Sequence, residues 1–584
     1  MKKFYSLYLL FVFCPLFCCS ALAQQLTVNV DSVGQLAAQL PDSIRYTMEE
    51  LKVCGPLNGA DLKIVQQIAN RNKAKKAGEV VLTAIDLSEI TIVEGKGVTV
   101  TKSDRLPGAF FSGCKSLQRV VLPEVSAAVS RSCFSGCSSL KEVTIPESVI
   151  LIDDNAFANC TGLEELKLPQ RLTEIGKGAF SDCTALHQIE IPETVGNIEA
   201  SAFNNCKQLE RVTFNGRVPY ISSSLFANCE RLEEIVLPAT VKAIGSDAFK
   251  KCIALQRVES SEPVGEIGNS AFEGCTSLQT IDLSRAATIG SEAFRDCNSL
   301  SAVEMESSSR IGNSAFEGCS ALSAVTIDGN LQAIGTETFK ECTNLESVTL
   351  PKSVKTIGTR AFLGCKSMAT IDLPASLTRI YDHAFEECTS LKYIYIPQLV
   401  KQMGSDTFEN CTSLDSVYIQ GFVEKLESDV FRSCHSLRKV ILPVSVKTIG
   451  DNAFAECASL KTLELPISLS SIGDDAFEQC TSLVSIVVPA ACTSIGSSAF
   501  RECSALQRVE LPAAIRKLGG NAFAKCVSLR ELYCAAPLPP SIAHSTFKGT
   551  TLAALRIVVP KGAKVNYTND KQWSKLPYIV EQQQ

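Results

Sequence analysis

Cysteine is the residue type of this chain whose spacing first suggests chemistry. Nineteen of the 26 cysteines recur from Cys114 to Cys526 at intervals of 23 residues, with two intervals of 22 around Cys297. Thiols at regular spacing could form disulfides, hold a metal or act as nucleophiles. Each of these cysteines follows a Phe by three residues and precedes a Leu by three, except that Met368 replaces one Leu. A period of about 20 to 50 residues is typical of a stacked solenoid.

The periodicity favours a reduced, structural cysteine ladder. Equivalent residues of stacked coils lie about 4.8 Å apart with parallel Cβ vectors, whereas the Cβ atoms of a disulfide are about 3.5–4.5 Å apart. An odd set of nineteen also cannot pair completely. A buried free Cys behaves as a small apolar residue, so scattered disulfides and a metal site are the weaker alternatives. Four cysteines outside the ladder are better candidates for a bridge or a reactive thiol: Cys54, Cys133, Cys492 and Cys534.

The other residues that could do chemistry form no recognisable catalytic motif. The four histidines, His187, His383, His435 and His544, have no metal-ligand or catalytic spacing to one another. The sequence has no glycine-rich phosphate loop, nucleophile elbow or zinc motif, and its carboxylate pairs recur beside the expected strands. We therefore expect no catalytic residues, no metal and no cofactor, and a protein that is not an enzyme.

Residues 160–183 show the elements that one repeat provides. Leu166 and Leu168 alternate with charged residues, which predicts a short strand with one buried face. Pro169 ends this strand, because proline removes a ladder donor. Gly176 is expected to allow a turn with positive φ. Ala179, Phe180 and Cys183 then fall on one face of a short helical turn, which closes the coil.

One coil cannot bury its apolar face alone, so the copies must stack. We predict a right-handed curved or superhelical solenoid with one short strand and a short helical turn in each coil of about 23 residues. Stacking places Phe on Phe and Cys on Cys along the molecule.

The repeat resembles a known family. Residues 443–466, Pro-Val-Ser-Val-Lys-Thr-Ile-Gly-Asp-Asn-Ala-Phe-Ala-Glu-Cys-Ala-Ser-Leu-Lys-Thr-Leu-Glu-Leu-Pro, are similar to the BspA-like leucine-rich repeats of bacterial surface proteins. The resemblance covers about 430 of the 584 residues and implies a leucine-rich-repeat solenoid. It also implies a secreted or surface-exposed binder or adhesin for host proteins, other cells or polysaccharides. It brings no shared catalytic residues.

The two ends of the chain differ from the repeats. Residues 1–23 have the pattern of a signal peptide, with Lys2 and Lys3, an apolar stretch over residues 4–17 and a small-residue cleavage site at Ala23. Lipidation at Cys18 or Cys19 is the weaker alternative. We expect an N-terminal cap over residues 24–105, with a helix near residues 62–69 and strands near 79–87 and 90–93. The solenoid should then occupy residues 106–534, and a degenerate last coil and a C-terminal cap residues 535–584.

Composition limits the partners. The formal net charge is −6, so the chain has no excess of basic residues with which to bind nucleic acid. No stretch after the signal peptide is long and apolar enough to span a bilayer. The sequence therefore predicts an exported protein that is secreted or held at the cell surface, with its oligomeric state and its route of anchoring left open.

The exposed strand positions are the best place for a binding site. They fall five and seven residues after each Cys, and most hold charged or small polar residues. Tyrosine combines apolar area with a polar tip and suits both protein contacts and sugar stacking. The expected ligand-binding residues are Tyr393, Tyr395, Tyr418, Phe422 and Tyr381. An acidic column at the same strand positions is a secondary candidate: Glu259, Asp282 and Glu304.

These features favour a binding or adhesion protein that presents an extended solenoid surface to a host extracellular protein, a cell surface or a polysaccharide. One alternative is a structural envelope scaffold without a tight ligand. A glycan-active enzyme is the lesser alternative, since it would need clustered acids in a concave site.

Overall fold

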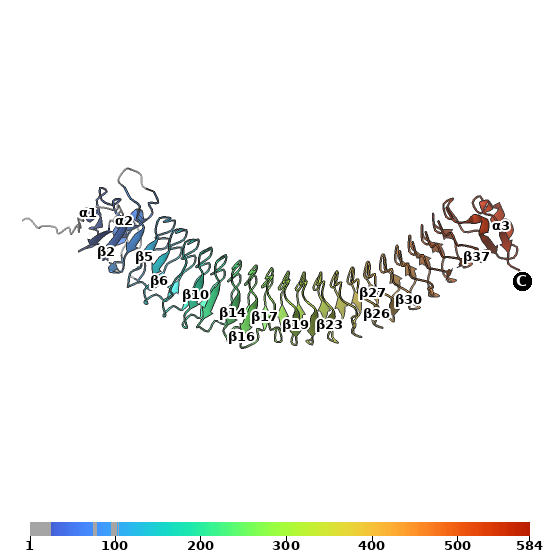
Figure 1. Ribbon diagram of the computed structural model, residues 1–584, viewed down its shortest axis with the longest axis horizontal. Coiled ribbons are helices and arrows are strands. Elements are labelled where there is room, and N and C mark those ends of the chain that lie inside the picture. Colours follow the sequence, from blue (N-terminus) through green and yellow to red (C-terminus); the bar gives the residue numbers. More distant parts are fainter. Residues whose placement is uncertain (1–24, 74–78, 95–101, 103, 584) are drawn as a thin grey trace, which may run out of the picture.

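The structure is a computed structural model, and it describes residues 25–73, 79–94, 102 and 104–583. The expected signal peptide, with Cys18 and Cys19, lies outside the described residues. Within them, the chain winds into stacked coils that form one long arc with the two ends of the sequence at opposite tips (Figure 1). The predicted repeat solenoid is confirmed.

Most coils begin with the predicted strand, five to eight residues after their Cys. Alternation buries every second side chain, as in β26 (Tyr393–Ile396), where Ile394 and Ile396 are fully buried and both tyrosines are exposed. Neighbouring strands pair in parallel and in register. We call these strands the first row: β5 (Arg119–Val121), β7 (Glu142–Thr144), β10 (Gln188–Ile191), β12 (Arg211–Phe214), β14 (Glu234–Leu237), β16 (Arg257–Ser260), β19 (Ala302–Met305), β21 (Ala324–Ile327), β23 (Ser347–Thr349), β26, β28 (Ser416–Ile419), β30 (Lys439–Ile441), β33 (Ser485–Val487), β35 (Arg508–Leu511) and β37 (Glu531–Cys534).

The first row is interrupted. Residues 165–168, which the sequence predicted to be a strand, keep the expected burial of Leu166 and Leu168 but form no regular strand. Residues 281–283, 370–373 and 462–465 also lie outside strands. The row is therefore divided into short sheets, among them β10-β12, β19-β21-β23 and β26-β28-β30.

Each coil also contains a second, two-residue strand that the sequence did not predict. Its second residue is buried and its first is at least partly exposed in nearly every coil, as in β9, where Ile175 is buried. We call these strands the second row: β6 (Ala128–Val129), β8 (Leu151–Ile152), β9 (Glu174–Ile175), β11 (Asn197–Ile198), β13 (Tyr220–Ile221), β15 (Ala243–Ile244), β17 (Glu266–Ile267), β18 (Thr288–Ile289), β20 (Arg310–Ile311), β22 (Ala333–Ile334), β24 (Thr356–Ile357), β25 (Arg379–Ile380), β27 (Gln402–Met403), β29 (Lys425–Leu426), β31 (Thr448–Ile449), β32 (Ser471–Ile472), β34 (Ser494–Ile495) and β36 (Lys517–Leu518).

The segment around each Phe is a pair of tight turns, so the expected helical turn is corrected. In the coil of Cys183, the N–H groups of Ser181 and Cys183 donate to the carbonyls three residues earlier, while those of Phe180 and Asp182 donate to the next coil. A helix would direct its N–H groups within itself. Positive φ occurs at Gly178 and Asp182, five and one residues before the Cys.

Gly176 does not have the expected positive φ. It lies where two coils approach, and an added Cβ would lie 2.7 Å from the backbone nitrogen of Asp154. A side chain at this position would therefore collide with the neighbouring coil. Glycine avoids this collision in the coil of Gly176, whereas Asp153, Ser222 and Tyr381 occupy the same repeat position in other coils.

The aromatic core is a continuous stack. From Phe111 to Phe547, consecutive ladder phenylalanines have ring centroids 5.1–5.7 Å apart and interplanar angles of 2–22°. Stacked rings of this kind contribute both buried apolar area and ring–ring attraction. The Phe column is thus the axis of the solenoid core.

The cysteine ladder has a specific role as a column of donors. From Cys137 to Cys526, each thiol donates to the backbone carbonyl of the ladder Phe in the preceding coil, with Sγ–O distances of 2.9–3.3 Å. Burial raises the pKa of the Cys183 thiol to about 12, which keeps the proton on the sulfur. Thr550 stands at the Cys position of the last coil, and its hydroxyl donates to Phe523 O at 2.6 Å.

The N-terminal region continues the first row with further parallel strands and adds two helices. They are β1 (Gln25–Asn29), α1 (Leu36–Gln39), β2 (Glu50–Leu57), α2 (Gly59–Ala69), β3 (Ala84–Asp86) and β4 (Ile90–Ile92), and β3 pairs with β5. The predicted helix is α2, whose N-terminus is a capping box between Asn58 and Asp61. At its C-terminal end, Asn70 Oδ1 lies 3.5 Å from Cys114 Sγ and takes the place of a Phe carbonyl.

The C-terminal region closes the other tip. It contains η1 (Leu552–Ala554), β38 (Arg556–Val559), α3 (Lys564–Asn569), η2 (Trp573–Lys575) and β39 (Ile579–Glu581). Trp573 is fully buried, and its Nε1 donates to Pro540 O at 2.7 Å. Its role is therefore packing, and it offers no platform to a ligand.

We expect Phe316→Ala to lower the free energy of unfolding by about 3–5 kcal/mol, because it leaves a cavity in the middle of the ring stack. Urea unfolding monitored by circular dichroism measures this change. Phe422→Ala is the matched control, since this ring is 62% exposed and its loss should cost less than about 0.5 kcal/mol. Equal costs for the two changes would contradict the stacked core.

We expect Cys319→Val to destabilise the protein by about 1 kcal/mol more than Cys319→Thr. Valine and threonine have nearly the same shape, but only threonine keeps a donor for Phe294 O, as Thr550 does for Phe523 O. The same unfolding measurement compares the two variants. If valine proves the milder substitution, the thiol hydrogen bond does not contribute to stability.

Candidate binding surface

The predicted tyrosines meet on the exposed face of one short sheet. In β26-β28-β30, Tyr395 pairs with Tyr418 and Tyr418 with Ile441. In the adjacent column, Tyr393 pairs with Ser416 and Ser416 with Lys439. We call Tyr393, Tyr395, Tyr418 and Ile441 the tyrosine face. The buried residues between them anchor each side chain from behind.

The rings are held in a defined arrangement. Tyr395 and Tyr418 stack with centroids 4.6 Å apart and an interplanar angle of 10°, while Tyr393 meets Tyr395 edge-on at 5.9 Å. Lys439 Nζ lies 5.2 Å from the centroid of Tyr418, a cation–π distance. Tyr395 is 52% exposed. The face thus combines apolar area, phenol hydroxyls and one cation on a hydrogen-bonded sheet.

The other two predicted aromatic residues lie elsewhere. Phe422 follows β28, past the turn at Gly421, and is 62% exposed. Tyr381 follows β25 in the second row, where its hydroxyl and ring contact Arg379. No ring contact joins either residue to the tyrosine face within the described part of the chain. Their role as ligand contacts stays a prediction.

Sequence analysis missed four exposed apolar residues near this face: Ile441, Leu399, Val444 and Ile467. Ile441 continues the column of Tyr395 and Tyr418, seven residues after its Cys. The other three lie at the corner that follows the strand. The period itself could have identified them, had every repeat position been compared for large apolar side chains.

The acidic column is exposed but loosely arranged. Glu259 lies on β16 with its carboxylate 3.9 Å from Arg257 Nε, and Glu304 lies on β19. Asp282 lies outside any strand and accepts hydrogen bonds from the backbone and side chain of Ser284. The column as a cation or partner site stays a prediction.

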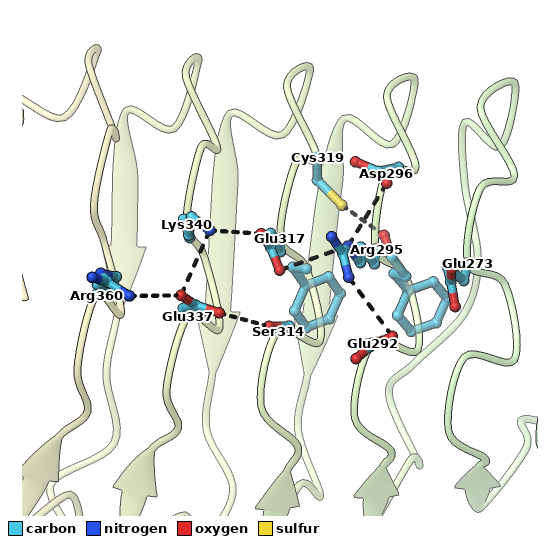
Figure 2. Close-up of polar contacts among 12 residues, drawn as sticks. Glu273, Glu292, Arg295, Asp296, Ser314, Glu317, Cys319, Glu337, Lys340 and Arg360 are labelled. Atoms are coloured by element: carbon cyan, nitrogen blue, oxygen red, sulfur yellow. Dashed lines mark hydrogen bonds and ion pairs between the residues drawn. The ribbon is translucent and has the colours of Figure 1, made fainter.

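Charged residues also form a ladder on the turns, two and five residues before each Cys. Figure 2 shows its central part, where Glu317 lies between Arg295 at 3.7 Å and Lys340 at 2.9 Å. Lys340 also pairs with Glu337, which pairs with Arg360. Burial alone would raise the pKa of Glu317, but the bonds from Lys340 and Ser314 lower it below its ordinary value. Alternating charge is therefore the arrangement that stabilises this column.

The alternation fails in the coils that carry the tyrosine face. Carboxylate oxygens of Asp406, Glu409 and Asp429 lie within 4.8 Å of one another, and Glu386 precedes Glu409 in the ladder. Burial, then the carboxyl groups of Asp406 and Glu386, raise the pKa of Glu409 to about 7. Carboxylates are ligands of hard cations, so by donor type these three residues could hold one, a possibility that the sequence did not reveal.

Two basic side chains already face these carboxylates. Arg432 lies 3.3 Å from Asp429 and 3.8 Å from Glu409. His383, which sequence analysis left without a partner, has Nδ1 2.8 Å from Glu386 and Nε2 3.8 Å from Asp406. The negative charges of this group are therefore partly balanced, and the group belongs to the ladder of charged residues on the turns.

Two hollows of about 350 and 340 Å³ lie beside the irregular segment 165–168. Glu165 and Lys167 line both, and Glu190 and Arg211 line the larger one. A glycan-active site would hold one carboxyl group in a protected environment that raises its pKa. Glu165 and Glu190 are both exposed instead, like the other strand flanks.

No helix among the described residues combines the length and the apolar character that crossing a bilayer requires.

Comparison with known proteins identifies the repeat. The family model for the BspA type leucine rich repeat region (6 copies) matches residues 105–233, 219–332, 309–438 and 424–553. No curated protein matches the chain significantly in sequence.

Several solved structures are similar to the chain. A leucine-rich repeat protein from Bacteroides ovatus is 25% identical, with 77% of this chain and 86% of that chain covered and a TM-score of 0.28. A leucine rich cell surface protein from Faecalibacterium prausnitzii is 25% identical, with coverage of 59% and 87% and a TM-score of 0.33. The pneumococcal vaccine antigen PcpA is 18% identical, with coverage of 68% and 79% and a TM-score of 0.26.

We expect Glu409→Gln to raise the free energy of unfolding at pH 8 by about 1 kcal/mol, a value reduced for screening by solvent. The folded-state pKa of Glu409 is raised above 4.5 to about 7, so the wild-type protein loses stability as pH rises through this window. At about pH 4, below both pKa values, the two proteins should be equally stable. Thermal unfolding at both pH values tests this.

Glu317→Gln is the matched control, at the same repeat position. The pKa of Glu317 is lowered, so its ionised form contributes stability above the ordinary pKa, and its removal should destabilise the protein at pH 8. Effects of the same sign in both variants would contradict the assignment for Glu409.

Proposed function

The chain belongs to the BspA-type leucine-rich repeat family, and we propose that it is an exported, non-enzymatic binding or adhesion protein. It presents the exposed side of its first row to a host extracellular protein, a cell surface or a polysaccharide. The observation that carries this proposal is the tyrosine face, where Tyr395 stacks on Tyr418, Tyr393 meets Tyr395 edge-on and Ile441 pairs with Tyr418.

Rigid support makes this face suitable for recognition. Exposed tyrosines contribute large contact areas at a low entropic cost, and they are enriched among the residues that dominate binding energy. Here each tyrosine sits on a strand whose neighbouring residues are buried, such as Ile394 and Val417. Little conformational entropy would be lost when a partner binds.

Export is supported by the amino terminus and by the repeat family. Lys2 and Lys3, the apolar stretch over residues 4–17 and the small residues before Gln24 have the pattern of a cleaved signal. The absence of a catalytic motif from the sequence supports a binding role over an enzymatic one.

The test is a binding screen of residues 24–584 against purified extracellular matrix proteins and polysaccharides. The variant Tyr393→Ser, Tyr395→Ser, Tyr418→Ser is measured in parallel, with circular dichroism to show that it folds. We expect at least one component of the screen to bind the wild-type protein and to bind the variant at least about tenfold more weakly, a loss of about 1.4 kcal/mol.

Val236→Ser is the matched control, because Val236 occupies the same strand position in a distant coil and is 58% exposed. It should bind as the wild-type protein does. Binding that survives the tyrosine changes would move the site elsewhere on the solenoid. Failure of every component to bind would favour the structural scaffold.

A further inference from the structure

Large exposed apolar side chains are concentrated on a few coils. Among the described residues, none lies between Ile253 and Tyr381 in the sequence, whereas seven lie between Tyr393 and Ile467. Soluble proteins rarely expose contiguous apolar patches unless these take part in binding. The exposed apolar residues therefore extend beyond the four residues of the tyrosine face.

The additional residues lie beside the tyrosine face at two adjacent repeat positions. Leu399 and Phe422 come eleven residues after Cys, and Val444 and Ile467 ten residues after Cys, at the corner of four consecutive coils. Their exposed fractions are 53–80%. The three preceding coils have Asn330, Lys352 and Ala375 at this corner. We call these four exposed residues the apolar corner: Leu399, Phe422, Val444 and Ile467.

The arrangement of the rings disfavours a sugar ligand. A sugar ring stacks on an open aromatic face, but Tyr395 and Tyr418 cover each other and Lys439 lies over Tyr418. Sugar hydroxyls buried without hydrogen-bond partners lose free energy. The apolar corner offers no side-chain donor or acceptor to replace water. Protein side chains, by contrast, can bury apolar area against both the tyrosine face and the apolar corner.

The charges beside the face point to an acidic partner. The residues four positions after Cys, at the start of the strands, are Lys392, Asp415, Arg438 and Lys461 in these coils. Arg438 pairs with Asp415 at 3.1 Å, while Lys392 and Lys461 have no ion pair with any described carboxylate. In the ten coils from Glu164 to Ala369, the same position has no Lys or Arg. Lys141, in the distant coil of Cys137, is a further lysine at this position without an ion pair to a described carboxylate, but it has no tyrosine face beside it. Lys392 and Lys461 thus place two unpaired ammonium groups beside the exposed apolar residues.

We propose that the tyrosine face and the apolar corner together bind a protein whose contact segment presents apolar side chains flanked by acidic residues. This inference rests on the proposed function and names its partner class. The exposed apolar residues supply the contact area. Lys392 and Lys461 orient the partner and exclude basic competitors.

The test is a selection from a phage-displayed library of short random peptides on immobilised residues 24–584. We expect enriched peptides to contain at least two large apolar residues and a negative net charge. Synthetic copies should bind at least about tenfold more weakly to Tyr395→Ser, Tyr418→Ser and to Lys392→Glu, Lys461→Glu. The matched controls Val236→Ser and Lys141→Glu occupy the same repeat positions in distant coils and should bind normally.

Other outcomes overturn this proposal. Absence of enrichment, enrichment of neutral or basic peptides, or equal binding to the variants would each contradict it. Light scattering tests a second copy as occupant: a wild-type dimer that the tyrosine changes dissociate would assign the face to self-association. A polysaccharide whose binding is lost in the tyrosine variant would uphold the proposed function and refute the acidic protein partner.

Discussion

The carbonyl group of each ladder Phe is the acceptor on which the stacking of coils depends. Phe294 O accepts the backbone N–H of Cys297 in its own coil at 3.1 Å and the thiol of Cys319 in the next coil at 3.1 Å. A carbonyl oxygen has two lone pairs and can accept both bonds, so the second bond links the closure of one coil to the presence of the next. The Thr550 hydroxyl makes the same bond without sulfur. The ladder therefore requires a short donor at this position, and cysteine supplies one that is also apolar.

Uniform stacking determines what the surface can do. Because every coil advances by nearly the same distance, each repeat position becomes a column in which side chains touch their counterparts. Aromatic residues in a column must stack, as Tyr395 and Tyr418 do. Charged residues in a column stabilise one another where they alternate in sign, as Arg295, Glu317 and Lys340 do (Figure 2). A binding surface on such a molecule can be changed one coil at a time while the core stays constant.

The sequence period was sufficient to predict the core and the three tyrosines of the tyrosine face, but not Ile441. Phe, Cys and Leu repeat at fixed distances, so their stacking followed directly, and the alternation in 393–396 exposed Tyr393 and Tyr395 as expected. The second-row strands were missed because two residues give no alternation to detect. The turn at Phe180 was mistaken for a helix because apolar spacings of three and four fit tight turns as well. Gly176 has too little space for a Cβ, a constraint between coils that no single repeat reveals.

Two departures from the regular pattern of the columns occur in the same coils: large apolar side chains are exposed, and carboxylates lie next to one another. The coils of Cys388, Cys411 and Cys434 carry the tyrosine face. On their turns, Glu386, Asp406, Glu409 and Asp429 lie together, with Arg432 and the imidazole of His383 as the basic side chains beside them. Burial, together with the neighbouring carboxylates, raises the pKa of Glu409 and reduces stability at neutral pH. Proteins tend to break local rules of stability at functional sites. The coincidence of exposed apolar area and unbalanced charge in three of nineteen coils therefore argues that these coils are adapted to recognition, while the others mainly extend and support the arc.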